Sequence, residues 1–249
     1  EDSLYSDFYD VKNDAITQEI ETQVKSGKTA VKRIYAGIQT LRSNEYARIA
    51  FTHSNRSIQI SQESPEVTNL RLGDFKWRPF QIIFQLMNIN GLTAFNEEDS
   101  FFEERNILDL AWFPTGGGKT EAYLGLIAYL GFYRRLRDPI GETLPSVHVI
   151  MRYTLRLLTM DQGERLVRLM GGMNCVANES MHSEIKNGQR FRVGMWIGKK
   201  SSPNRLQTSI DKSDAKSILN SIRTGAQRHN SRVIMFENCP WCGDNGLSS

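Results

Sequence analysis

The sequence predicts a three-layer α/β domain, a parallel sheet with helices on both faces, preceded by a mainly helical region. Three observations support this fold class. Apolar residues recur at helical spacing near the N-terminus. An apolar run, a glycine-rich loop and a second apolar stretch follow one another over residues 107–136, and strand-like and helix-like segments alternate from there to residue 236. Strands that alternate with helices pair in parallel through right-handed crossovers.

Residues 1–69 are expected to form a helical accessory region. The residues that recur at helical spacing are Val31, Ile34, Tyr35, Ile38 and Leu41. A Gly-Lys-Thr triplet ends at Thr29, but it lacks preceding glycines and an apolar strand. It therefore predicts a helix break and restart, with Ser26 or Thr29 as the cap, rather than a phosphate-binding loop.

Residues 70–249 are expected to form the α/β domain, after a polar linker at residues 61–65. The helices are expected at residues 79–90, from the glycine loop to just before Pro139, at 162–170 and at 213–222. The strands are expected at residues 107–113, 147–152, 192–197 and 232–236.

Composition fits an ordinary globular protein. Of its 249 residues, 39% are hydrophobic and 24% charged, and the net charge is only +3. No apolar run reaches the length of a membrane-spanning helix, and no secretory signal opens the chain, so a cytoplasmic location is expected. Three cysteines cannot build a disulfide framework. Basic residues are frequent between residues 134 and 205, where solvated surface and nucleic-acid contact are both open.

A phosphate-binding loop is the strongest functional signal. Residues 113–120 read Phe-Pro-Thr-Gly-Gly-Gly-Lys-Thr. Glycines lack Cβ atoms, so successive backbone N–H groups can surround phosphate oxygens at a helix N-terminus. Lys119 would reach the β- and γ-phosphates, and the Thr120 hydroxyl would bind Mg²⁺; these two are the predicted catalytic residues. The alternative is a glycine-rich turn that happens to precede Lys-Thr.

A string of Trp-Arg-Pro-Phe-Gln at residues 77–81 lies about forty residues before Lys119. The Gln81 amide can donate and accept at once, as the adenine N6 and N7 atoms require. The alternative is a helix start with Pro79 in the first turn and Gln81 exposed. The predicted nucleotide-binding residues are Arg78, Gln81, Thr115, Gly116, Gly117, Gly118, Lys119, Thr120 and Glu121.

Two further segments have the chemistry of a nucleic-acid backbone site. Residues 151–159 combine guanidinium and hydroxyl groups, both donors to phosphate. A strand expected to end near residue 197 runs into a basic loop that is either a second backbone contact or plain surface. The predicted contacts are Arg152, Tyr153, Thr154, Arg156, Thr159, Lys199 and Lys200.

The residues Cys-Pro-Trp-Cys-Gly at 239–243 have the spacing of a zinc knuckle. Cys239 and Cys242 would supply two of four ligands, with the others expected beyond Ser249. A redox pair and two unrelated buried cysteines are the alternatives. An acidic residue that positions Mg²⁺ is also needed for hydrolysis. Glu237 follows an apolar run, but the acidic motif is expected outside this sequence.

Together, residues 77–81, 112–124, 152–159 and 196–204 resemble the DrmA family, helicase-like subunits of the DISARM phage-defence system within the superfamily 2 helicases. Members of that superfamily often carry a small residue where Phe113 stands, and many build their adenine pocket from a string like residues 77–81. The resemblance implies a motor with two RecA-like P-loop domains, dependent on ATP and Mg²⁺, that binds DNA and works with a companion subunit, DrmB.

The chain would then supply an accessory region and part of the first RecA-like domain of an ATP-dependent DNA helicase or translocase in bacterial anti-phage defence. Hydrolysis by this fragment alone is not expected. Two other functions stay open: a nucleotide-gated DNA-binding scaffold that unwinds nothing, and a small-molecule kinase that shares only the phosphate loop.

Overall fold

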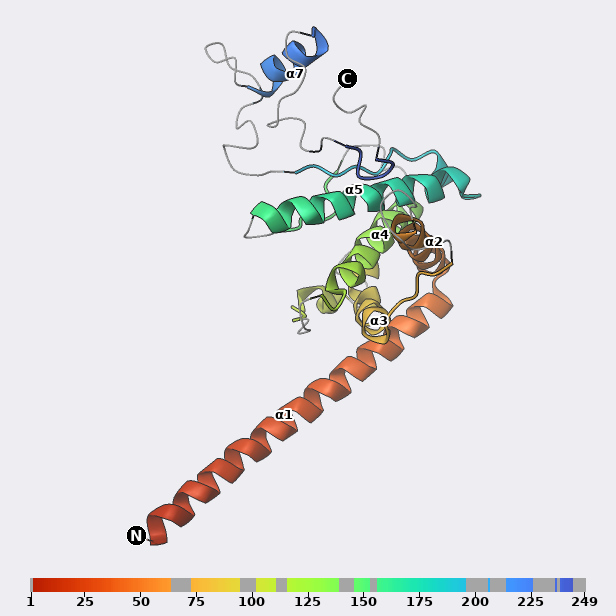
Figure 1. Cartoon of the computed structure of the whole chain (residues 1–249). Coiled ribbons are helices and arrows are strands. Elements are labelled where there is room, and N and C mark those ends of the chain that lie inside the picture. The colour runs from red at the N-terminus through yellow and green to blue at the C-terminus, as the bar shows by residue number, and fades with distance from the viewer. Residues whose placement is uncertain are drawn as a thin grey trace. The chain divides into compact units, whose positions relative to one another are not determined.

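The computed structural model describes residues 2–63, 73–94, 102–110, 116–138, 146–152, 156–195, 206, 214–225, 236 and 238–243 (Figure 1). Within these ranges the side chains of residues 2–14, 102 and 156–159 are not described. The helices are α1 (Asp2–Ser43), α2 (Glu45–Gln62), α3 (Pro79–Thr93), the 3-10 helix η1 (Phe102–Asn106), α4 (Lys119–Arg137), α5 (Arg156–Glu179), α6 (Ser183–Lys186) and α7 (Ala215–Arg223).

The predicted α/β fold is wrong: the described part of the chain is helical and contains no strand. Three segments that were expected to be strands have no regular secondary structure where they are described, at residues 107–110, 146–152 and 192–195. Leu108 is 95% exposed and Ile150 is 78% exposed, whereas a buried strand would cover both. A strand exists only through hydrogen bonds to a neighbouring strand, so apolar composition alone cannot create one. The prediction of a RecA-like sheet, which came from the resemblance, is therefore wrong as well.

The predicted helices are confirmed, with shifted ends. Helix α3 begins at Pro79 as expected, since proline fits the first helical position. Helix α4 runs from the glycine loop to Arg137, two residues before Pro139, and α5 extends well beyond the predicted 162–170. Helix α7 begins after Asp214, whose carboxylate accepts the Ser217 N–H over 2.8 Å as an N-cap. None of the described helices is long and apolar enough to cross a bilayer.

The predicted break near Thr29 is also wrong, because α1 runs unbroken from Asp2 to Ser43 (Figure 1). The Thr29 hydroxyl donates to the Lys25 carbonyl over 3.0 Å, one turn back within the same helix. A glycine inside a helix costs about 1 kcal/mol relative to alanine, which a helix of this length absorbs.

The chain divides into two compact units, residues 1–49 with 77–126, and residues 50–76 with 127–249. The boundary predicted near residue 70 lies outside the described residues and stays a prediction.

In the first unit, α1 and α3 pack closely through Gly37. A Cβ at this position would overlap the backbone carbonyl of Leu86 on α3. One turn further along α1, the buried Thr40 hydroxyl donates to the side-chain oxygen of Asn90. The earlier part of α1 makes no such packing contact, since every residue from 15 to 29 is exposed. The second half of α1 therefore fixes the position of α3.

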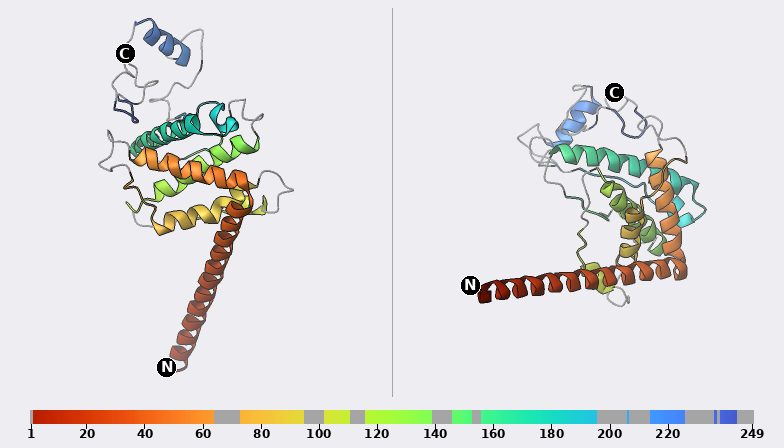
Figure 2. Two further views of the ribbon diagram at one scale, coloured as in Figure 1. Left: turned by 90° about the vertical axis from the view of Figure 1, so that its right-hand side faces the viewer. Right: turned by 60° about the horizontal axis from the view of Figure 1, so that its bottom comes forward.

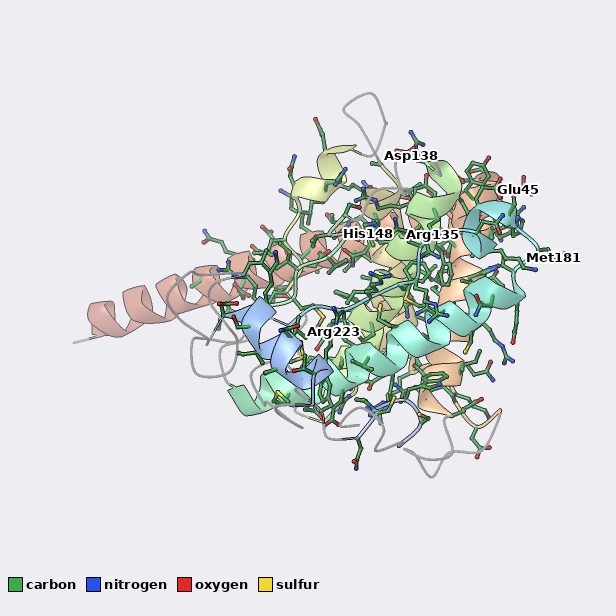
Figure 3. The ribbon with its side chains drawn as sticks, turned by 90° about the horizontal axis from the view of Figure 1, so that it is seen from above. Glu45, Arg135, Asp138, His148, Met181 and Arg223 are labelled. Atoms are coloured by element: carbon green, nitrogen blue, oxygen red, sulfur yellow. The ribbon has the colours of Figure 1, made fainter. Side chains whose placement is uncertain are left out.

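In the second unit, aromatic residues of α4 form the core. Tyr129, Phe132 and Tyr133 are fully buried. The buried Arg135, labelled in Figure 3, lies with its guanidinium carbon 3.4 Å from the centre of the Phe191 ring and donates to the carbonyls of Ile185 and Gln189. These contacts hold α6 and the segment after it against α4.

Helix α5 packs against α2 through a second close approach (Figure 2). A Cβ at Gly172 would lie 2.5 Å from the carbonyl oxygen of Ser57 on α2. The neighbouring Gly171 instead lies against the ring of Trp241.

Candidate nucleotide site

The glycine loop, Gly116 to Gly118, has a backbone that only glycine adopts readily. Gly116 and Gly118 have φ angles of 78° and 84°, in the left-handed region. A Cβ at Gly118 would also lie 2.7 Å from the Gln81 side-chain nitrogen, whereas a Cβ at Gly116 would meet nothing within 4 Å. The loop leads directly into α4, which begins at Lys119. The first N–H groups of a helix lack intrahelical partners and attract anions.

The N-terminus of α3 holds this loop through its carbonyl groups. Arg78 Nη1 donates to the Gly117 carbonyl over 2.7 Å, and Gln81 Nε2 donates to the Gly118 carbonyl over 2.7 Å. The Arg78 backbone N–H in turn donates to Gln81 Oε1 over 2.8 Å, which ties the Gln81 side chain back to the residue before α3. The two strings that the sequence singled out, 37 residues apart, are therefore in contact.

These hydrogen bonds orient the backbone of the loop. In a planar trans peptide the C=O and N–H groups point in opposite directions, and none of the described peptide bonds is cis. The Gly117 carbonyl shares its peptide with the N–H of Gly118, and the Gly118 carbonyl shares its peptide with the N–H of Lys119. With both carbonyls turned toward Arg78 and Gln81, the two N–H groups point away from them. A phosphate-binding loop requires such aligned donors.

Gln81 is buried, which contradicts the alternative description of an exposed residue at a helix start. It is only 4% exposed, so it is not the surface residue of a plain helix start. Its amide is also partly occupied, because the oxygen accepts from Arg78 and the nitrogen donates to Gly118. One amide hydrogen and one lone pair remain for another partner. Its contact with a base stays a prediction.

Thr120 and Glu121 lie with Lys119 in the first turn of α4. The Thr120 hydroxyl accepts a hydrogen bond from the Tyr123 hydroxyl over 3.0 Å. Tyr123 was missed by sequence reasoning, although its spacing of three residues after Thr120 places both on one helix face.

An ion pair fixes the segment that leads to the loop. The Arg33 guanidinium of α1 binds both carboxylate oxygens of Asp109, over 2.6 and 2.9 Å, and Glu104 of η1 lies 3.9 Å from its Nε. The hydrogen bonds with Asp109 are the largest cause of a raised pKa of Arg33. No local pattern reveals this pair, because 76 residues separate its members. Helix α1 thus anchors a residue seven positions before Gly116.

Six of the seven predicted nucleic-acid side chains lie outside the described ones. Arg152 is exposed at the end of the segment 146–152, and Arg156 begins α5 with its side chain undescribed. The remaining predictions lie outside the described side chains, namely Tyr153, Thr154, Thr159, Lys199 and Lys200. Thr115 and Glu237 are likewise outside the described residues.

The cysteine turn, residues 239–243, adopts a tight reversal. The Gly243 N–H donates to the Cys239 carbonyl over 2.8 Å, and Gly243 has a φ of 71°. This conformation, with two cysteines separated by two residues, suits half of a tetrahedral zinc site. Among the described residues no group of three or more potential metal ligands occurs.

The cysteine turn is anchored on α5 by a ring. A Cβ at Gly171 would overlap the six-membered ring of Trp241, so the indole lies directly on the helix backbone. Cys175, one turn further along α5, is a free thiol. Burial, with a smaller contribution from Glu179, raises the pKa of Cys175.

Comparison with known proteins gives one relationship. No protein-family model matches the chain. The DISARM protein DrmA of Bacillus paralicheniformis is 34% identical to it over 242 residues, which cover 91% of this chain and 21% of that protein. The chain thus spans about a fifth of the length of the curated relative it matches. Over most of its length, the chain is related to DrmA.

Proposed function

We propose that this chain carries the nucleotide-binding site of an ATP-dependent DNA helicase or translocase that acts in DISARM anti-phage defence. The observation that supports this most is the glycine loop, whose carbonyls are tied to Arg78 and Gln81 while its N–H groups point the other way. This arrangement suits the β- and γ-phosphates of ATP at the start of α4.

Each residue of the site would have a separate task. Lys119 would stabilise the charge that develops on the γ-phosphate, and the Thr120 hydroxyl would bind the Mg²⁺ that bridges the phosphates. Gln81 would use its remaining donor and acceptor on the adenine edge. The residues present fit Mg²⁺, since a hydroxyl oxygen is a ligand that this hard cation accepts beside water and phosphate.

Contacts outside the nucleotide site complete the proposal. Arg152 and its neighbours would bind the DNA backbone, and Lys199 and Lys200 would add a second contact. A zinc ion bound by Cys239, Cys242 and two further ligands would stabilise the cysteine turn. The companion subunit DrmB would be the protein partner.

ATP hydrolysis by the full-length protein, with and without single-stranded and duplex DNA, tests the motor. We expect strong stimulation by DNA and a loss of roughly two to three orders of magnitude in turnover for Lys119→Ala, since the variant removes a charge from the transition state. Lys28→Ala is a matched control, because Lys28 belongs to a Gly-Lys-Thr triplet in the exposed part of α1.

Two results would contradict the motor. Turnover retained in Lys119→Ala would remove the assignment of the phosphate site. Tight ATP binding without turnover, whatever DNA is added, would favour the nucleotide-gated scaffold instead.

A further inference from the structure

The hydroxyl groups of Thr120 and Tyr123 form a pair at the start of α4. The Tyr123 hydroxyl lies 3.0 Å from Thr120 Oγ1 and donates to it, and both side chains are partly buried. Side chains in a helix point toward its N-terminus, so a tyrosine three residues after Thr120 extends back over the preceding turn. The ring thus brings a second hydroxyl to the atom that is expected to bind Mg²⁺.

The direction of this hydrogen bond matters for a metal. A threonine hydroxyl has one hydrogen and two lone pairs, and the hydrogen rotates to suit its surroundings. A cation bound to Oγ1 needs a lone pair that faces it, so the Oγ1 hydrogen must point elsewhere. A phenol oxygen also accepts, so the pair can reverse when a cation approaches, with Thr120 as the donor and Tyr123 as the acceptor.

We propose that Tyr123 is a positioning residue for Mg²⁺ at the nucleotide site. It holds the Thr120 side chain in place and accepts a hydrogen bond from the Thr120 hydroxyl, so that a lone pair of Oγ1 faces the metal. This inference rests on the proposed nucleotide-binding function. Mg²⁺ demands near-ideal octahedral geometry, so a freely rotating hydroxyl is a poor ligand for it. Partners that orient a metal ligand typically change metal affinity by about tenfold to a hundredfold.

The test is equilibrium binding of a fluorescent ATP analogue to the full-length protein over a range of Mg²⁺ concentrations. Tyr123→Phe removes only the hydroxyl and keeps the ring. We expect it to raise the half-saturating Mg²⁺ concentration by about tenfold while leaving nucleotide binding in EDTA unchanged.

Tyr133→Phe is the matched control. Tyr133 lies ten residues later in the same helix, and its buried hydroxyl has no hydrogen-bond partner within the described ranges. The same atom is removed there, so its Mg²⁺ titration should match that of the unmodified protein. Thr120→Ala should lose the Mg²⁺ dependence, and adding Tyr123→Phe to it should change nothing more, because Tyr123 acts through Thr120.

The outcomes separate this inference from the function on which it rests. An unmodified protein that binds no nucleotide removes both. If nucleotide binding depends on Mg²⁺ and on Thr120 but Tyr123→Phe titrates like the unmodified protein, the inference is wrong and the function stands. Weaker binding of Tyr123→Phe in EDTA as well would assign the tyrosine a structural role and also overturn the inference.

Discussion

The glycine loop and the cysteine turn are both short reversals with a left-handed glycine, but different forces hold them. Arg78 and Gln81 hold the loop by directional hydrogen bonds to its carbonyls. In the cysteine turn the Gly243 N–H donates to the Cys239 carbonyl, and the Trp241 ring anchors the turn over Gly171 of α5. Hydrogen bonds fix orientation as well as position, while apolar stacking fixes mainly position. A phosphate site needs oriented donors, whereas metal bonds would themselves orient the cysteines.

The largest predicted effect comes from a substitution that disrupts the glycine loop. Gly118→Ala would place a left-handed alanine against the Gln81 amide, with its Cβ 2.7 Å from the nitrogen. Backbone strain costs about 1–3 kcal/mol, and displacement of Gln81 would add to it. We expect ATP affinity, measured by calorimetric titration, to fall by about tenfold to a hundredfold or more.

Gly116→Ala is the control for this prediction. It has a similar φ, but its Cβ would meet nothing within 4 Å, so only the strain applies. Equal losses in the two variants would show that the contact with Gln81 does not matter.

The second prediction concerns the anchor of the cysteine turn. Gly171→Ala would push a methyl group into the Trp241 ring. Overpacking of this kind costs about 1–3 kcal/mol, against a gain of about 0.5–1 kcal/mol from replacing a helical glycine. We expect a net loss in the free energy of unfolding of about 1 kcal/mol by denaturant titration.

A double-mutant cycle identifies the cause of that loss. In a Trp241→Ala background the obstacle is gone, so Gly171→Ala should become neutral or stabilising. An equal loss in both backgrounds would mean that the ring does not rest on this glycine.

The same contrast explains what the sequence could predict. Helices α3 and α4 were predicted because their signals are local: apolar spacing, Pro79 at the first position and a glycine loop before Lys119. The predicted strands were wrong, because a strand requires a pairing partner that no local pattern reports, and Leu108 is left exposed.

Contacts between residues far apart in the sequence could not be predicted either. The pair of Arg33 with Asp109 joins segments 76 residues apart, and the stacking of Trp241 on Gly171 also spans a long stretch of chain. Neither has a sequence signature. The closeness of Gln81 to the glycine loop was accessible only because both motifs were recognised as parts of one site. Tyr123 was also missed, although it has a local signal, its spacing from Thr120.

The smallest predicted effect concerns the alkylation rate of Cys175. Cys175 lies one turn after Gly171 on α5, and burial raises the pKa of its thiol. Since the thiolate is the nucleophile, alkylation by iodoacetamide at pH 8 should be slower than for an unperturbed cysteine and should increase as the pH rises through the raised pKa. A thiol whose folded pKa is raised contributes stability below its unfolded pKa of about 8.5 and loses that contribution as the pH rises further.

The same alkylation measurement after metal removal with EDTA tests whether Cys175 is a metal ligand. Chelation should speed the alkylation of Cys239 and Cys242, because a zinc-bound thiolate is protected, and should leave the rate at Cys175 unchanged. Mass spectrometry of the labelled peptides separates the three sites. A Cys175 rate that rises with the other two would make this thiol a third ligand, and α5 would then hold the turn through the metal as well as through the ring of Trp241.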